Sequence, residues 1–431
     1  MIRAVEVWLD ADVSPLSRVG TLHDDRGQVR FHYDRDWIGG PHAFALDPDL
    51  SLDAQPFFPR PETGNFGVFL DSSPDRWGQA LMTRREALAA HDGGRPPRTL
   101  YAWDFLLGVQ DLTRQGALRF RDPASGEFLA NERLAAPPVT SLAELEAVAR
   151  DLTSRRVDNL ELLRRWLAVL LAPGASLGGA RPKANFTDRD GTIWIGKFPS
   201  RDDTYDQGAC EFLLHTLGAR AGIDVPAARL QCFSDYHTFC VQRFDRVGTV
   251  RRFYASALTL LRRSDSEGAS YLDIAQLLQN AGDPANIAGD LEQLFRRVVF
   301  NVMVGHRDDH LRNHGFLLSR GGWRLAPAFD INPQPEKDSH VLNLDDRDPH
   351  PSIATVLETH EFYRLDRGRA ENIIEEVARV VDEWPTEAQK IGLARAEQLM
   401  LRPAFSAHAS HRAGMDAAPA PRPPRGRRRR R

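Results

Sequence analysis

The residues best suited to chemistry form the octapeptide HRDDHLRN at His306–Asn313. It places a carboxylate at Asp308 five residues before an amide at Asn313. Transfer of a phosphoryl group needs a carboxylate that orients the attacking hydroxyl and accepts its proton, and a neutral oxygen that helps to hold Mg²⁺. A short extended loop would set both side chains on one rim, with Asp308 as the base and Asn313 as a metal ligand. Asp309 is the alternative base, but it lacks the five-residue offset.

A second acid follows this loop, whose pattern H-R-D-x-x-x-x-N is that of the catalytic loop of protein kinases. Asp330 lies seventeen residues beyond Asn313, in the segment LAPAFDINP. A hairpin over Gly315–Leu325 would turn the chain back and bring Asp330 beside Asn313 as the second Mg²⁺ ligand. Ile331-Asn332 stand where Phe-Gly is usual, so the metal-binding role is retained but a phenylalanine-based switch does not follow.

Cations for the phosphates of a nucleotide are expected across the cleft. Lys197 ends the strand-like segment TIWIGKF, and Glu211 on the following helix could hold it. Before that strand, SLGGARPK at Ser176–Lys183 is a small turn whose Gly178 and Gly179 could lie over the phosphates. The chain contains no G-x-x-x-x-G-K-[ST], which argues against a P-loop ATPase. Each signal is weak alone, and their order along the chain carries the prediction.

Three histidines leave a different enzyme open. His306, His310 and His314 are spaced at i, i+4 and i+8, which on a continuous helix would align three imidazoles as metal ligands of a hydrolase. Glycines just before the first and just after the third histidine argue against such a helix, and a hydrolase leaves Lys197 and Asp330 unexplained. The non-enzymatic alternative is a kinase-fold scaffold that binds a regulator without turnover.

The elements that must position these residues begin with a small sheet. Val5–Leu9 and Val29–Tyr33 are strand-like and flank a polar turn at His23–Gly27. Helical patterns follow from Asp75 to about Ala90 and over Tyr101–Val109.

The middle of the chain combines helices with a hairpin. Amphipathic helices are expected at Leu142–Leu152 and Leu160–Leu171, and Asp190-Gly191 is a turn signal between the strands Lys183–Thr187 and Thr192–Phe198. The remainder is mostly helical, with predicted helices at Gln207–Ala221, Tyr254–Leu261, Ser270–Asn280, Asp290–Val304, Ala370–Trp384 and Glu387–Met400.

The composition is that of a globular protein with 42% hydrophobic and 27% charged residues, and 431 residues suggest two or three packed units. No stretch approaches the ~18 consecutive apolar residues that would span a bilayer. The amino terminus lacks the apolar core of a secretory signal. Cys210, Cys232 and Cys240 cannot build a disulfide framework, so a reducing cytoplasm is expected.

The carboxy-terminal decamer Arg422–Arg431 (RPPRGRRRRR) contains seven arginines and no acids. Without those seven charges the net charge of the chain moves from −3 to −10, so the body is acidic and the tail basic. A segment of this composition cannot bury a core and is expected to be disordered from about Met415. It could touch nucleic acid or an acidic protein surface, or serve only as a solvated tail.

As a whole, the sequence resembles the HipA family, the kinase halves of bacterial type II toxin–antitoxin modules. The resemblance runs from about residue 5 to residue 400. It is carried by SLGGARPKANF, by FDR at Phe244–Arg246 after the strand CVQR, by GHRDDHLRNHGFLL and LAPAFDINP, by VGTL at Val19–Leu22, by FGVFLDSSPDRWG at Phe66–Gly78 and by LLGVQDLTRQGALRF at Leu106–Phe120.

The resemblance implies an α+β, two-lobed protein-kinase-like fold with a small β-rich amino-terminal subdomain and a mostly helical carboxy-terminal lobe. The implied parts are an amino-terminal HipA-type subdomain at 1–140, an ATP-binding N-lobe region with the glycine-containing loop at 141–250, a helical catalytic C-lobe at 251–405 and a disordered Arg-rich tail at 415–431.

It also implies roles for residues that the motif alone leaves open. Lys183 and Lys197 would contact the phosphates of ATP, and Gln242 and Phe244 would form the hinge beside its adenine. Gln242 stands where an acidic hinge residue is common. Ser176 occupies the family's autophosphorylation position, where a phosphate of about −2 charge would repel the ATP phosphates, eject the loop and switch the kinase off.

Finally, the resemblance implies partners. Family members phosphorylate serine or threonine residues of proteins, notably aminoacyl-tRNA synthetases, and are neutralised by a DNA-binding antitoxin of the HipB type. Contact with DNA is therefore expected indirectly, through the antitoxin, with the Arg-rich tail as a possible aid. No membrane partner is expected.

Overall fold

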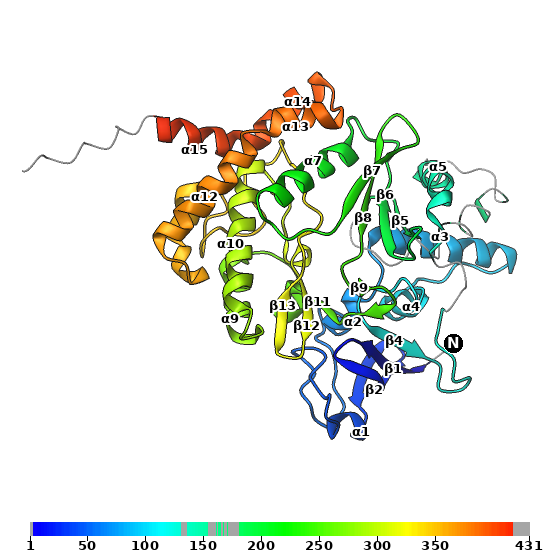
Figure 1. Ribbon diagram of the computed structural model, residues 1–431. Coiled ribbons are helices and arrows are strands. Elements are labelled where there is room, and N and C mark those ends of the chain that lie inside the picture. The colour runs from blue at the N-terminus through cyan, green and yellow to red at the C-terminus, as the bar shows by residue number, and fades with distance from the viewer. Residues whose placement is uncertain are drawn as a thin grey trace, which may run out of the picture.

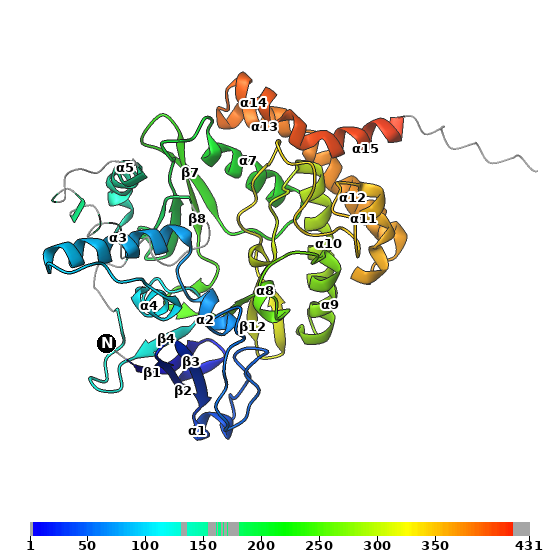
Figure 2. The same cartoon turned by 180° about the vertical axis from the view of Figure 1, so that it is seen from behind.

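The fold consists of a small β domain, a second sheet and a large helical lobe (Figures 1 and 2). The computed structural model describes residues 3–130, 136–153, 161, 163–164, 167, 170 and 181–416. None of the helices in these ranges is long and apolar enough to cross a membrane.

The amino-terminal domain is built on an antiparallel sheet of order β3-β2-β1-β4. Alternate residues of β1 point into its core, which places Val5, Val7 and Leu9 out of contact with solvent. The strands are β1 (Ala4–Ala11), β2 (Ser14–Asp25), β3 (Gln28–Tyr33) and β4 (Leu118–Arg121). The helices of this part are α1 (Arg35–Ile38), α2 (Gly67–Asp71), α3 (Arg76–Asp92) and α4 (Ala102–Gly108).

A second antiparallel sheet, of order β5-β6-β8-β7, forms the small lobe. Its strands are β5 (Lys183–Thr187), β6 (Ile193–Lys197), β7 (Ala228–Cys232) and β8 (His237–Gln242). Helix α5 (Leu142–Thr153) packs on one face of this sheet together with Trp77 and Leu81 of α3. The predicted Asp190-Gly191 turn joins β5 to β6, with Gly191 in the left-handed region at φ +83°.

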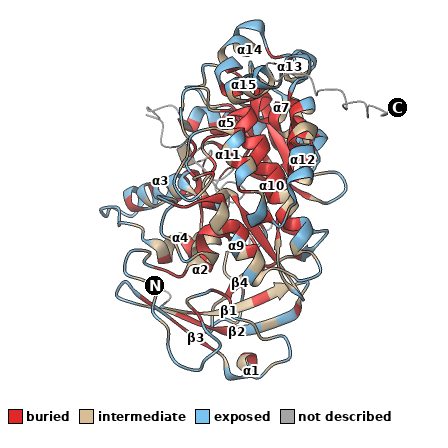
Figure 3. Cartoon of the chain, turned by 90° about the vertical axis from the view of Figure 1, so that its left-hand side faces the viewer, coloured by how far each residue is buried: buried red, intermediate tan, exposed pale blue. Residues whose placement is uncertain are grey.

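The helical lobe is organised around α10 (Ile287–Val304), which is buried along most of its length (Figure 3). A three-stranded sheet of β11 (Tyr254–Ser256), β12 (Gly315–Ser319) and β13 (Gly322–Leu325) lies where this lobe meets the amino-terminal domain. The other helices are α7 (Gln207–Arg220), α8 (Ala257–Leu260), α9 (Tyr271–Ala281), α11 (Ile353–Glu358), α12 (Arg367–Val381), α13 (Trp384–Ile391), α14 (Arg395–Leu401) and α15 (Ser406–Asp416).

Two helix predictions need correction. Tyr254–Leu261 is not one helix, because its first residues pair with β12 as strand β11 before the short helix α8 begins. The predicted helix Glu387–Met400 is interrupted at Gly392, where φ is +97°. Helix α15 was not predicted. The predicted helix Leu160–Leu171 lies largely outside the described residues.

Two further features match the predictions. The hairpin of β12 and β13 is present, with its turn at Arg320-Gly321 and Ser319 paired with Gly322. All three cysteines are free thiols, and Cys210 is buried in the core of the helical lobe.

Candidate active site

Lys197 and Glu211 meet at the edge of the small lobe, as the sequence predicts. Lys197 is the last residue of β6, and its Nζ lies 2.5 Å from Glu211 Oε1 on α7. Helix α7 is fixed at its start by Asp206, whose carboxylate accepts a hydrogen bond from the Ala209 amide. Both members of the ion pair are buried, so removing either would leave a charge without its partner.

Asp330 joins this pair from the other lobe. Its Oδ1 lies 2.6 Å from Lys197 Nζ, although the two residues are 133 positions apart. The hairpin of β12 and β13 returns the chain to this point, and Asp330 adopts a left-handed backbone conformation with φ +59°. Burial alone would raise the pKa of Asp330, but the charges of Lys197 and Lys183 outweigh it and hold that pKa well below its usual range.

The catalytic loop follows the end of α10, where Gly305 caps the helix in the left-handed conformation. Asp308 is half-exposed, and its backbone carbonyl accepts a 3.4 Å hydrogen bond from Asn313 Nδ2. A small cavity is lined by Asn313 together with Phe329 and Ile331, the residues that flank Asp330. The fold therefore brings Asn313 and the segment around Asp330 to one cavity.

Asp309 is a structural residue in this arrangement. Its buried carboxylate accepts hydrogen bonds from Tyr271 Oη (2.8 Å) and Asn301 Nδ2 (2.8 Å), and its Oδ2 lies 2.9 Å from His314 Nε2. His306 lies on its other side, with 3.6 Å between Nε2 and Oδ1. These contacts fix the loop from beneath, so the half-exposed Asp308 is the acid that faces solvent.

The three histidines do not form the aligned set that a metal hydrolase would need. Helix α10 ends at Val304, so His306, His310 and His314 do not share a helix. His306 and His314 flank Asp309, and His306 Nδ1 also lies 2.9 Å from the carbonyl oxygen of Asn332. Within the described ranges there is no group of three or more His, Cys, Asp or Glu side chains that could hold a metal ion.

Lys183 lies opposite Lys197 in the pairing of β5 with β6. Its Nζ is 3.1 Å from the Asp75 carboxylate at the start of α3, and both side chains are buried. Burial raises the pKa of Asp75 to about 6, an effect that the Lys183 charge offsets only in part. The predicted phosphate-binding lysine is thus held by the amino-terminal domain, a contact that the sequence did not reveal.

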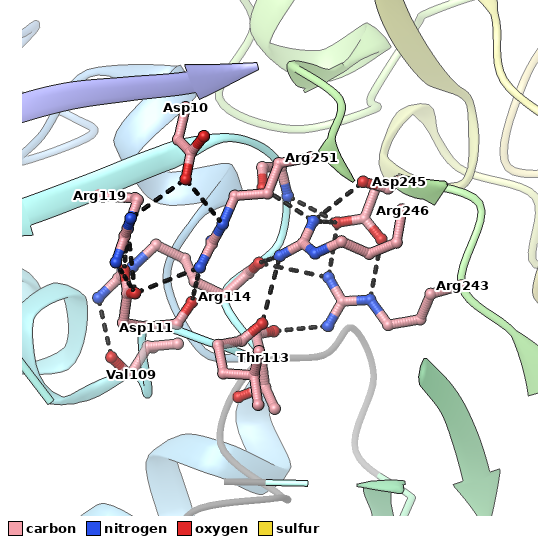
Figure 4. A network of polar contacts seen from close by, with 12 residues as sticks. Asp10, Val109, Asp111, Thr113, Arg114, Arg119, Arg243, Asp245, Arg246 and Arg251 are labelled. Atoms are coloured by element: carbon pink, nitrogen blue, oxygen red, sulfur yellow. Dashed lines mark hydrogen bonds and ion pairs between the residues drawn. The ribbon is translucent and has the colours of Figure 1, made fainter. Parts of the chain in front are cut away.

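The predicted hinge at Gln242–Phe244 is anchored by a buried network of arginines and aspartates (Figure 4). Arg243 donates to Asp245 at 2.8 and 2.6 Å, to the Thr113 carbonyl at 2.5 Å and to Asn185 Oδ1 at 3.0 Å. Arg246 donates to Asp245 (2.7 Å) and to the carbonyls of Arg114 (2.6 Å) and Gly116 (2.9 Å).

Beside these two arginines, Arg251 and Arg119 bind Asp111, which continues the network into the amino-terminal domain. The hinge is thereby tied to that domain. Phe244 itself packs against Phe329 with tilted rings, 5.3 Å between the centroids, and Phe329 directly precedes Asp330.

Other predicted residues fall differently. Ser176, Gly178 and Gly179 lie outside the described residues. Sequence reasoning also missed Gln334 and Lys337, which contact the catalytic loop from the segment after Asp330. Neither residue belongs to a motif, and only the reversal of the chain after Asp330 brings them there.

The chain is similar to known proteins in both sequence and structure. A family model for the HipA-like C-terminal domain matches residues 175–384, and one for the HipA N-terminal domain matches residues 5–96. The chain is 26% identical over 357 residues to the protein Y4mE of Sinorhizobium fredii, whose name describes it as a kinase, with 77% of each chain covered. It is 23% identical over 189 residues to the serine/threonine-protein kinase toxin HipA of Shewanella oneidensis, covering 37% of this chain and 43% of that one.

The fold has a solved counterpart. A chain from the complex of HipA, HipB and operator DNA of Shewanella oneidensis superposes with a TM-score of 0.63 at 18% identity, covering 94% of this chain and 96% of that one. This likeness confirms the predicted two-lobed, kinase-like α+β fold. The chain belongs to the HipA family. With relatives named as kinases, it falls in the kinase class.

Proposed function

We propose that the chain is an ATP- and Mg²⁺-dependent protein serine/threonine kinase that acts as the toxin of a toxin–antitoxin module. One observation carries the proposal: the contact of Lys197 with both Glu211 and Asp330, in a fold that also holds Asp308 and Asn313 together on one loop. This is the set of groups that phosphoryl transfer requires, with cation, metal ligands and base on facing surfaces.

Each group has a defined task in this reaction. The acceptor hydroxyl oxygen forms a bond to the γ-phosphorus of ATP while the bond from that phosphorus to the β–γ bridging oxygen breaks. ADP leaves with the electron pair of the broken bond, and the hydroxyl proton passes to Asp308. Lys197 and Lys183 bind the phosphates, and Gln242 and Phe244 line the adenine side.

The residues present fit a magnesium ion. Asn313 and Asp330 offer an amide and a carboxylate oxygen, the kind of ligand that Mg²⁺ prefers. When bound, Mg²⁺ supplies positive charge that neutralises the phosphates. Lys197 contacts Oδ1 of Asp330, and the carboxylate of Asp330 would supply an oxygen that holds the ion.

Partner and regulation are also part of the proposal. The solved relative is in complex with HipB and operator DNA, and the likeness covers almost the whole chain, which supports a DNA-binding antitoxin as partner. The family resemblance supports autophosphorylation at Ser176 as an off-switch and a translation-related protein, such as an aminoacyl-tRNA synthetase, as substrate.

Incubation of the phosphatase-treated protein with γ-labelled ATP and Mg²⁺ tests the proposal. Label is expected in the parent, with Ser176 among the sites mapped by mass spectrometry. Asp308→Ala should carry none, whereas Asp346→Ala, which removes an acid that is 69% exposed on a surface loop, should behave like the parent. A parent that binds ATP but never acquires or transfers label would contradict kinase activity and favour the scaffold alternative.

A further inference from the structure

The segment that follows Asp330 runs beside the catalytic loop and is fixed to it. Gln334 Oε1 accepts hydrogen bonds from the backbone amides of Arg307 (2.8 Å) and Asp308 (3.1 Å). The backbone amide of Gln334 donates to the Gly305 carbonyl at 2.9 Å, and the backbone amide of Val341 donates to the Arg307 carbonyl at 3.0 Å. Residues 334–341 therefore keep a defined position next to the reactive carboxylate.

Lys337 lies in the middle of this segment and its Nζ contacts Asp308 Oδ1. The Lys337 side chain is 40% exposed and that of Asp308 is 51% exposed. An ion pair this open to water contributes little to stability, because solvent screens it and two side chains must be ordered. Its position on the predicted base is therefore better explained by chemistry than by folding.

The arginine next to Asp308 in the sequence does not take this place. Arg307 donates instead to the backbone carbonyls of Gln334 and Lys337, and to Ser406 Oγ at 3.4 Å. The Arg307 guanidinium thereby holds the backbone of the segment at Gln334 and Lys337. The cation on the Asp308 carboxylate is supplied by the segment.

The charges of the cleft explain why a cation is needed there. Lys197 and Lys183 stand on the sheet side, paired with Glu211, Asp330 and Asp75. On the opposite side, the Asp308 carboxylate would repel the γ-phosphate that it must approach, since both are negative. A lysine suits this position because its ammonium is a compact charge with three donors on a flexible stem.

We propose that Lys337 is a catalytic residue: its ammonium group neutralises Asp308 in the resting site and moves to the transferred phosphoryl group in the reacting complex. This inference rests on the proposed kinase activity. In the step itself Lys337 forms no covalent bond and keeps its proton. It stabilises the negative charge on the phosphoryl oxygens while Asp308, released from the ion pair, accepts the hydroxyl proton.

The test compares three variants of the full chain in autophosphorylation with γ-labelled ATP and Mg²⁺, at a range of ATP concentrations. Lys337→Met should lower the maximal rate about 100- to 1,000-fold, the usual loss when one preorganised charge donor is removed. The half-saturating ATP concentration should change less than about threefold, because the contact forms in the transition state. Lys337→Arg returns the positive charge, so its maximal rate should be at least about tenfold higher than that of Lys337→Met.

Lys390→Met is the matched control, because it removes another exposed lysine that pairs with a glutamate on α13. It should match the parent. Melting temperatures of all three variants should stay within about 2 °C of the parent, as for ordinary surface substitutions.

Three results would decide against Lys337. A maximal rate of Lys337→Met within twofold of the parent would remove it from the reaction. If Lys337→Met and Lys337→Arg both lost ATP affinity and melting temperature, each to the same extent, Lys337 would be a structural tether. A parent that transfers no phosphate at all would overturn the kinase proposal and the role of Lys337 with it. An active parent together with an active Lys337→Met variant would overturn only the role of Lys337.

Discussion

Two regions of this molecule are equally rich in paired charges, yet they are built for different ends. In the network at the hinge, Arg243 and Arg246 are buried and donate both to Asp245 and to backbone carbonyls of the amino-terminal domain. At the proposed active site, Lys197 and Lys337 each contact a partly exposed carboxylate, since Asp330 is 36% exposed and Asp308 51%, and Lys197 also pairs with the buried Glu211.

The difference lies in the cation and in what can replace its partner. A guanidinium presents several donors in a rigid fork, and at the hinge these are saturated by carboxylate and carbonyl oxygens that cannot leave. An ammonium is a mobile point charge, and a phosphate or metal ion can take over either side of its pair. The proposed chemistry therefore falls on pairs that are carried by lysine, and the structural role falls on the arginine network at the hinge.

The largest effect is expected from Asp330→Asn in the cleft. Loss of the carboxylate that is proposed to bind Mg²⁺ should lower the rate of phosphate transfer at least about 1,000-fold, because the metal contributes several kcal/mol to the transition state. Thermal unfolding should change little, since the side chain is partly exposed. A variant that kept more than a tenth of the parent rate at saturating Mg²⁺ would remove Asp330 from the metal site.

Asp245→Ala should have the largest effect on stability. It leaves Arg243 and Arg246 buried without their shared carboxylate, which should cost about 3–5 kcal/mol in the free energy of unfolding. Urea denaturation measures this loss. Asp12→Ala is the matched control, because Asp12 forms an exposed pair with Arg252 in the same region and should cost less than about 1 kcal/mol. Equal losses in the two variants would contradict a structural role for the buried network.

Glu211→Gln should give an intermediate effect on catalysis. The amide keeps the size of the side chain but no longer fixes the Lys197 ammonium by charge, so kcat/KM for ATP should fall about 10- to 100-fold through misplacement of the phosphate contact. Glu383→Gln, on a half-exposed surface pair with Arg220, should leave kcat/KM unchanged. An unaltered kcat/KM in Glu211→Gln would show that Lys197 needs no partner to bind phosphate.

The smallest effect near neutral pH is expected from the titration of Asp245. Burial would raise its pKa, but the charges of Arg243 and Arg246 outweigh this and hold the pKa well below the usual range. A depressed pKa means that its contribution to stability is complete above the ordinary aspartate value of about 3.9 and is lost as the pH falls below it. The stability difference between the parent and Asp245→Asn should therefore be constant from pH 5 to pH 8 and shrink below pH 4. A difference that changed between pH 5 and pH 8 would contradict the assignment.

Linear motifs made the cleft largely predictable. The spacing of Asp308 and Asn313, and the hairpin that returns Asp330, are local properties of the chain, so the sequence could indicate them. The contact between Lys197 and Glu211 also follows from a strand and a helix that are consecutive. The structure shows the contact between Lys197 and Glu211, while the roles of these residues in catalysis stay proposals.

The rest depended on distant contacts that carry no local signal. Arg243 binds a carbonyl 130 residues away, and Lys337 contacts Asp308 from 29 positions further along the chain, beyond the hairpin of β12 and β13. Strand β11 was predicted as part of a helix because a run this short shows no clear period, and its conformation is set by pairing with β12. Residue type alone did not indicate that the arginines of the hinge would be buried and Lys337 partly exposed.

The most direct test of this contrast is the rate of γ-phosphate transfer per folded molecule, at saturating ATP and Mg²⁺, for Asp308→Ala and Asp245→Ala. Asp308→Ala should be fully folded and about 100- to 10,000-fold slower, as expected for loss of a general base. Asp245→Ala should be much less stable but, per folded molecule, within a few-fold of the parent. An active Asp308→Ala protein, or a stable Asp245→Ala protein without activity, would contradict the account.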